Sequence, residues 1–205
     1  MDNIDMVFYI NLDKRIDRRS QIEYEFKNYG ICKYERFSAI YKPYPLGFLG
    51  CTLSHLGVLK LAKERGYKNI MIVEDDFAFK VSRDVFEAHI KEFFDLNIDY
   101  NVLSLQYHEN EPCIHINDIV SEVVNIQHTG CYLVNFNFFD TIIDTYQESA
   151  ELLEKSHCVA FSLDLMWKKH QGKGSKFFRF NTGHLGVQRA GFSDIGNFVT
   201  NGSNT

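Results

Sequence analysis

Short apolar runs alternate along this chain with segments of helical periodicity, and no other feature constrains the fold as strongly. Residues 6–11, 69–74 and 101–106 are short, largely apolar runs stopped by polar residues, the pattern of buried strands. Residues 51–66 and 83–97 repeat their apolar positions every three to four residues, as amphipathic helices do. Strands that alternate with helices predict an α/β domain with a mixed, mostly parallel sheet.

The same patterns predict the remaining elements. We expect further strands at 35–40, 121–127, 131–136 and 177–180, and helices that begin near Asp17, span 138–155 and open at 162. Residues 41–50 are expected to be a loop and 128–130 a turn between two strands, whereas 107–118 match no pattern. The length predicts a single domain over residues 1–196, followed by a flexible tail at 197–205.

Charge and cysteine content exclude several classes of protein. The net charge is −5 and no basic run is present, which argues against nucleic acid as a partner. The five cysteines are odd in number and form no C-x-x-C pair, which argues against a disulfide framework and a structural zinc site. Free thiols, an N-terminus without a basic signal-peptide region and no apolar stretch of membrane-spanning length predict a soluble, intracellular protein of the cytoplasm.

Three adjacent carboxylates, Glu74, Asp75 and Asp76, follow the apolar run at 69–74 directly. In parallel sheets, ligands bind beyond the carboxyl ends of strands. If the strand continues to Asp76, Glu74 and Asp76 point to one side and Asp75 to the other. Paired carboxylates suit Mn²⁺ or Mg²⁺ shared with a substrate phosphate. The alternative is a solvated acidic turn.

Basic residues follow the first apolar run. Arg15, Arg18 and Arg19 stand where a loop enters a helix, a position that suits a phosphate or diphosphate. A solvated basic helix face explains them equally well on sequence alone.

Several single residues allow two readings. Gly47 and Gly50 permit close backbone approach before a helix, and His55 lies one turn inside it, where a lone histidine is more often structural. Asp164 is either an N-terminal helix cap or a general base. His184 is either a late metal ligand or a surface histidine.

Taken together, five blocks resemble glycosyltransferase family 25, which includes bacterial lipooligosaccharide transferases, collagen galactosyltransferase domains and relatives in large DNA viruses. The blocks, in order, are YINLDKRIDRR, GFLGCTLSHLGVLKLAKERGYKNIMIVEDDFAF, TGCYLV, SLD and QRAGFSDI. The second block is the most specific, because a Gly-Cys-x-x-Ser-His-Leu helix, one strand and Glu-Asp-Asp occur in it in a fixed order.

The resemblance implies a GT-A-like, Rossmann-type nucleotide-sugar-binding sandwich with Mn²⁺ or Mg²⁺ as cofactor. It implies that the enzyme transfers a hexose from a UDP-sugar to a hydroxyl of a glycan, glycoprotein or collagen-like acceptor, with inversion, as in lipopolysaccharide biosynthesis. Asp76 and His184 would bind the metal, and Asp164 would activate the acceptor. The residues implied around the donor are Asn11, Leu12, Arg15, Arg18, Ser54, His55, Glu74, Asp75, Gln188, Ser193 and Asp194.

Two other functions stay open at this point. Metal-dependent phosphoryl transfer or hydrolysis also uses acids at strand ends. A domain that binds a nucleotide or glycan without turnover would keep the same residues. The products formed from a nucleotide sugar distinguish these classes.

Overall fold

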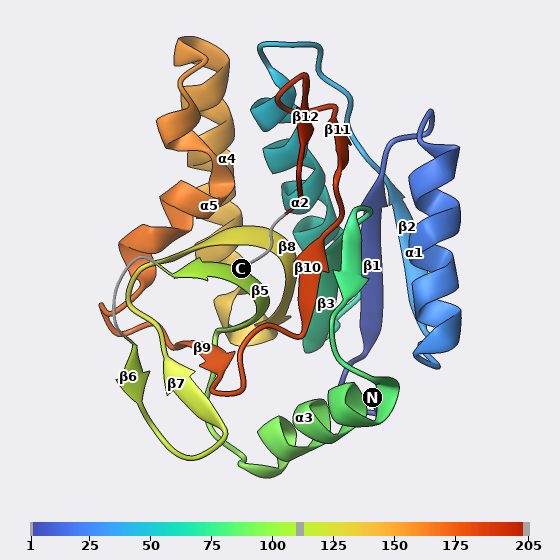
Figure 1. Cartoon of the computed structure of the whole chain (residues 1–205). Coiled ribbons are helices and arrows are strands. Elements are labelled where there is room, and N and C mark those ends of the chain that lie inside the picture. The colour runs from blue at the N-terminus through green and yellow to red at the C-terminus, as the bar shows by residue number, and fades with distance from the viewer. Residues whose placement is uncertain (1, 110–112, 203–205) are drawn as a thin grey trace.

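A computed structural model describes residues 2–109 and 113–202 and contains a mixed eight-stranded sheet (Figure 1). The strand order is β2-β1-β3-β8-β5-β9-β7-β6. Their bounds are β1 Met6–Asn11, β2 Tyr34–Ser38, β3 Asn69–Glu74, β5 Val102–Glu109, β6 Ile114–His115, β7 Val120–Glu122, β8 Ile126–Asn135 and β9 Phe177–Phe180. Strands β7 and β8 run against the other six, so the sheet is mostly parallel in strand direction, as predicted.

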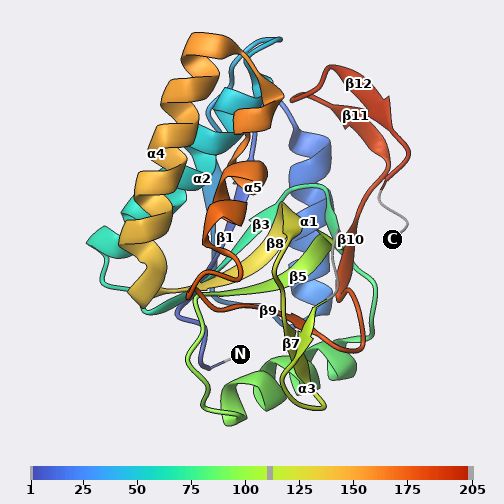
Figure 2. The same ribbon diagram turned by 90° about the vertical axis from the view of Figure 1, so that its left-hand side faces the viewer.

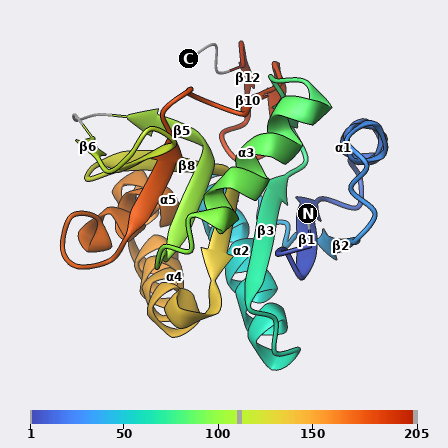
Figure 3. The same cartoon turned by 90° about the horizontal axis from the view of Figure 1, so that it is seen from below.

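Helices cover both faces of the sheet. Their bounds are α1 Ile16–Asn28, α2 Gly47–Glu64, α3 Arg83–Asp95, α4 Phe139–Ser156 and α5 Leu163–Met166, with short 3₁₀ turns at Phe136–Phe138, Val159–Phe161 and Trp167–His170. Helices α2 and α4 lie on one face, and α1 and α3 on the other (Figures 2 and 3). The strands between them are therefore buried on both sides, which explains their continuous apolar sequence.

Each face of the sheet has its own core. Leu56 and Leu59 of α2 pack on one side with Tyr146 of α4, whereas Phe86 and Ile90 of α3 pack on the other. The apolar positions that repeat along each helix in the sequence are thus the positions that are buried against the sheet. Helix α3 also begins at a Ser82 cap, as a polar residue before an apolar repeat predicts.

Two local expectations were wrong, and a stretch that matched no pattern contains strands. Residues 128–130 are not a turn, because β8 runs unbroken from Ile126 to Asn135. Helix α2 begins at Gly47, inside the segment expected to be a loop. Part of the unplaced stretch 107–118 forms the end of β5 and all of β6, and its residues 110–112 lie outside the described chain.

Two separate two-stranded antiparallel sheets lie beside the main sheet. Strand β10 (Gly186–Gln188) pairs with β4 (Phe77–Phe79), and β11 (Gly191–Ser193) pairs with β12 (Phe198–Thr200). Phe198–Thr200, in the segment expected to be a flexible tail, is therefore paired, whereas 203–205 lie outside the described residues. These two small sheets bring the C-terminal segment back to the ends of β1 and β3 (Figure 1).

The described part of the chain contains no helix that is both long and apolar enough to cross a bilayer. All five cysteines are free thiols.

Candidate functional site

The candidate site lies beyond the carboxyl ends of β1 and β3, two adjacent parallel strands. Ile10 is paired with Glu74, so the residues that follow each of them leave the sheet at the same edge. Asn11 and Asp75 meet there, and the Asn11 Nδ2 group donates to Asp75 Oδ2 at 2.7 Å. Ligands of α/β sheets bind at such an edge.

An open pocket occupies this edge of the sheet. Its walls come from the end of β1, the loop at 39–42, the first turns of α2, the acidic triplet and residues 188–195. The predicted site residues that line it are Leu12, Arg18, Ser54, His55, Glu74, Asp75, Asp76, Gln188, Ser193 and Asp194.

Arg18, in the first turn of α1, binds both aspartates of the triplet. Its Nη1 atom lies 2.9 Å from Asp75 Oδ1 and 3.0 Å from Asp76 Oδ2. The predicted strand alternation, which put these carboxylates on opposite sides, is wrong because β3 ends at Glu74 and a turn follows. Gln188 Nε2 also donates to Asp76 Oδ2, at 3.1 Å.

The triplet carries more buried negative charge than Arg18 balances. Burial, followed by the charge of Glu74, raises the pKa of Asp76 to about 6. Burial also raises the pKa of Asp75, although Arg18 and Asn11 oppose that shift. Buried carboxylates held close together are stabilised by a cation, and oxygen donors are the ligands that Mn²⁺ and Mg²⁺ prefer. The aspartates therefore fit a hard divalent ion.

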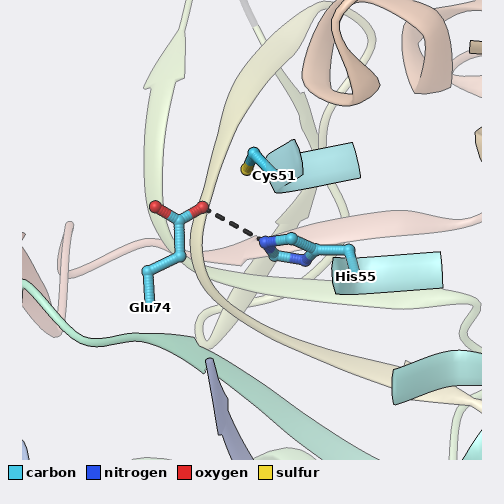
Figure 4. A group of neighbouring side chains, drawn as sticks. All are labelled: Cys51, His55 and Glu74. Carbon is cyan, nitrogen blue, oxygen red and sulfur yellow. Dashed lines mark ion pairs between the residues drawn. The ribbon is translucent and has the colours of Figure 1, made fainter. Parts of the chain in front are cut away.

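Glu74 is held by groups from two other elements. Its Oε1 lies 3.3 Å from Nε2 of His55 (Figure 4). The same oxygen accepts a hydrogen bond from the Thr129 hydroxyl at 3.2 Å. Burial opposes ionisation of Glu74, but His55, His128 and Thr129 together bring the pKa of its carboxyl below the usual value. Glu74 is thus an anion anchored in place.

Two glycines of α2 let the chain close around the pocket. A Cβ atom on Gly47 would lie 2.1 Å from the carbonyl oxygen of Ile195, and one on Gly50 would lie 2.5 Å from that of Ile40. The close approach expected at both positions is present, within the first turn of the helix. Ser54 adds to this wall, since its hydroxyl accepts from Ile40 N–H at 2.8 Å and donates to the Gly50 carbonyl at 2.7 Å.

Asp194 fastens the C-terminal segment to the loop after β1. Lys14 Nζ and Arg15 Nη1 each lie 2.7 Å from one of its carboxylate oxygens. Burial opposes ionisation of Asp194, but the two cations lower the pKa of its carboxyl overall. Arg15 is therefore directed at Asp194 and is not one of the lining residues of the pocket.

Asp164 lies in the first turn of α5, beside β8 and not in the lining of the pocket. Ser162, not Asp164, holds the cap position of this helix, so the capping role is not the one observed. The Asp164 carboxylate accepts from the Ser162 hydroxyl at 2.7 Å and from His128 N–H at 3.3 Å. His128 has a φ of 93°, a left-handed conformation that is strained for a residue with a side chain.

His184 contacts an aromatic residue of β5. Its ring packs against the ring of Tyr107, with centroids 4.1 Å apart, and it is not among the lining residues of the pocket.

The sequence alone did not single out several residues of the site. Thr129, Tyr132 and Lys14 reach it only because the fold brings β8 and the loop after β1 to one edge. Cys51 was detectable, since it precedes His55 by four residues and so shares a helix face with it.

Comparisons with known proteins give a sequence family and a similar fold. The sequence model of glycosyltransferase family 25 (LPS biosynthesis protein) matches residues 42–186. A search of curated protein sequences found no match. A solved glycosyltransferase involved in the glycosylation of the major capsid of PBCV-1 is similar in structure, with a TM-score of 0.52 and 10% identity over 85% of this chain and 80% of that one.

Two other solved structures are less similar. Glycosyltransferase GlyE of Streptococcus pneumoniae TIGR4 gives a TM-score of 0.46 and 10% identity over 85% of this chain and 45% of that one. A197 from STIV gives 0.45 and 12% over 95% and 92%. At 10% identity, the similarity to the capsid glycosyltransferase shows the fold alone.

Proposed function

The chain belongs to glycosyltransferase family 25, and from that premise we propose that it transfers a hexose from a UDP-sugar to a hydroxyl group of a glycan or protein acceptor. The proposal includes a GT-A-type fold, a bound divalent cation and inversion at the transferred carbon.

The observation that carries the proposal is the acidic triplet at the pocket edge, with Arg18 bound to two of its members. Carboxylates for a metal and a guanidinium for phosphate are the two groups that a nucleoside diphosphate requires. Both line one pocket at the carboxyl ends of parallel strands, where such ligands bind.

Asp76 and Asp75 are the proposed ligands of Mn²⁺ or Mg²⁺. When bound, such an ion acts as a Lewis acid that stabilises the departing diphosphate. Gln188 holds the Asp76 carboxylate in place by donating to it. We leave His184 out of the proposed ligand set, because its ring packs against Tyr107 outside the pocket lining.

Arg18 is the proposed phosphate ligand. A guanidinium binds phosphate in the same geometry as it binds carboxylate. When the donor binds, Arg18 can therefore replace its contact to Asp76 with one to a phosphate oxygen and retain its contact to Asp75. Asn11 supports this change of partner, because it donates a hydrogen bond to Oδ2 of Asp75 while Arg18 bonds to Oδ1.

The remaining donor residues divide into two groups. Leu12, His55, Ser193 and Glu74 line the pocket and are proposed to contact the donor. Ser54, Arg15 and Asp194 are proposed to act mainly by fixing the walls, since their hydrogen bonds and ion pairs run to Ile40, to the C-terminal segment and to the loop after β1.

Asp164 is the proposed general base. In the transfer, the acceptor oxygen bonds to the anomeric carbon, the bond from that carbon to the diphosphate breaks, and the acceptor proton passes to Asp164. The contacts from Ser162 and His128 support this role, because they orient the carboxylate while leaving lone pairs available.

Calorimetric titration of UDP with and without Mn²⁺ tests the proposal, together with product analysis of a UDP-hexose panel. We expect Mn²⁺ to increase UDP affinity in the wild type and to have no effect in Asp76→Asn. Wild-type Mn²⁺ dependence in that variant would refute the metal assignment. Inorganic phosphate in place of a transferred sugar would assign the chain to phosphoryl chemistry instead.

A further inference from the structure

A second group of metal-ligand side chains lies beside the acidic pair. One donor atom from each of Cys51, His55 and Glu74 lies within 4.8 Å of the other two. Cys51 and His55 are one turn apart on α2 and project toward Glu74 at the end of β3 (Figure 4). The group offers one sulfur, one nitrogen and one oxygen donor, the three kinds that Zn²⁺ binds in proteins.

His55 supplies an independent sign of a ligand. Its side chain has no exposed surface, and its Nε2 atom has no hydrogen-bond partner. Nε2 instead faces Glu74 Oε1 at 3.3 Å, without hydrogen-bond geometry. Nitrogen and oxygen ligands about 2.0–2.1 Å from a tetrahedral Zn²⁺ stand roughly 3.3 Å apart, so the observed spacing is that of two neighbouring ligands.

The other ring nitrogen of His55 is already oriented. Nδ1 lies 3.0 Å from the hydroxyl oxygen of Tyr132, a buried residue of β8. Metal-binding histidines usually engage a polar group through the nitrogen that does not bind the metal, and this contact fixes the ring. Tyr132 therefore stands in the position of an outer-shell partner.

We propose that Cys51, His55 and Glu74 form a site for a borderline-soft divalent cation such as Zn²⁺, separate from the hard-cation site at Asp76. The thiolate disfavours Mn²⁺ and Mg²⁺, which prefer oxygen ligands. All three residues line the pocket, so the ion has an entry path and a fourth coordination position open to water or ligand.

Such a site differs from the zinc sites that cysteine spacing reveals. The sequence argued against structural zinc because it contains no C-x-x-C pair. Here the fold supplies the third ligand from β3, about 20 residues beyond the helix pair. The site goes beyond the proposed transfer reaction and does not depend on it.

Cobalt titration tests the proposal, because Co²⁺ can take the place of Zn²⁺ and a cobalt–thiolate bond absorbs in the near ultraviolet. We expect the wild type to develop this band and Zn²⁺ to remove it by displacement. Cys51→Ser should lack the band and bind Zn²⁺ at least about tenfold more weakly, since changes even in the outer shell typically cost 10–100-fold. Cys32→Ser, which removes an exposed thiol, is the matched control and should keep the band.

Asp76→Asn separates the two metal sites. The cobalt–thiolate band should persist in this variant, whatever happens to Mn²⁺ or UDP binding. No band in the wild type, a band that survives Cys51→Ser or a band lost in Asp76→Asn would each overturn the proposal.

A measurement on the wild type covers the case in which Cys51→Ser does not fold. Zn²⁺ should slow alkylation of Cys51 by iodoacetamide and leave the rate at Cys32 unchanged, as read by peptide mass spectrometry. Equal alkylation of Cys51 with and without Zn²⁺ would also overturn the proposal.

Discussion

The Nη1 atom of Arg18 lies 3.0 Å from Oδ2 of Asp76, within the pocket proposed for the donor. A cationic side chain thus stands beside the carboxylate proposed to bind the metal. Arg18 and a divalent ion compete for Asp76 unless a phosphate takes up the guanidinium. Nucleotide and metal binding are therefore expected to be coupled through this pair.

Arg18→Gln should separate the two functions of this side chain. Without nucleotide, Mn²⁺ should bind more tightly because the competing charge is gone. UDP affinity should fall about tenfold or more and uridine affinity much less, since a charge-assisted hydrogen bond is worth roughly 1.5–3 kcal/mol. Titration calorimetry with Mn²⁺, uridine and UDP measures all three effects.

Arg19→Gln is the control for this prediction. Arg19 is half exposed and pairs with Glu23, so its removal should leave all three affinities unchanged. Equal losses of uridine and UDP affinity in Arg18→Gln would show that Arg18 does not contact the phosphates.

Asp194→Asn should lower stability in a pH-dependent manner. The pKa of Asp194 is lowered in the folded state, so the folded chain binds fewer protons there than the unfolded chain. The stabilisation is fully present above the ordinary carboxyl value of 3.8 and is lost as pH falls through the lowered folded-state value. At pH 7 we expect a loss on the order of 1 kcal/mol, which shrinks in acid. Urea unfolding of both proteins from pH 7 down to pH 3 measures it, and a constant difference would contradict the prediction.

The sequence predicted the elements whose burial is periodic. The strands at residues 6–11 and 69–74 agree with β1 and β3, because a strand covered on both faces has a continuous apolar sequence. The prediction failed at 128–130, where His128 and Gly130 gave the sequence the pattern of a turn. There β8 contains a left-handed residue at His128, and β5 is irregular opposite it.

The site was predictable in its parts but not in its contacts. The acidic triplet and Arg18 stood out because each follows a strand end. That Arg18 binds both aspartates depends on where β3 stops, which spacing does not determine to one residue. The approach of Cys51 and His55 to Glu74 depends on how α2 packs across the sheet.

Gly47→Ala should change the shape of the pocket without changing any of its charged or hydrogen-bonding side chains. The added methyl group would lie 2.1 Å from the Ile195 carbonyl oxygen, so the segment that carries Ser193 and Asp194 has to move. Such overpacking typically costs 1–3 kcal/mol, and UDP affinity should fall with it. In the control Gly191→Ala, the nearest atom to the new methyl is 3.9 Å away, so the melting temperature and UDP affinity should stay unchanged. Unchanged UDP affinity in Gly47→Ala would show that this segment does not shape the donor site.

Asp164→Asn tests the proposed base. The amide oxygen can still accept one of the two hydrogen bonds that Asp164 receives from Ser162 and His128, so the fold and UDP binding should survive. An amide cannot take up the acceptor proton, so turnover should fall by roughly 10²–10⁴. Ser162→Ala is the matched control: it removes one contact to the carboxylate but keeps the base, and its turnover should fall far less. Initial rates of sugar transfer and melting curves of the wild type, Asp164→Asn and Ser162→Ala test whether Asp164 is the base. Near-wild-type turnover in Asp164→Asn would exclude Asp164 as the base, whereas equal losses in Asp164→Asn and Ser162→Ala would assign its effect to the position of α5.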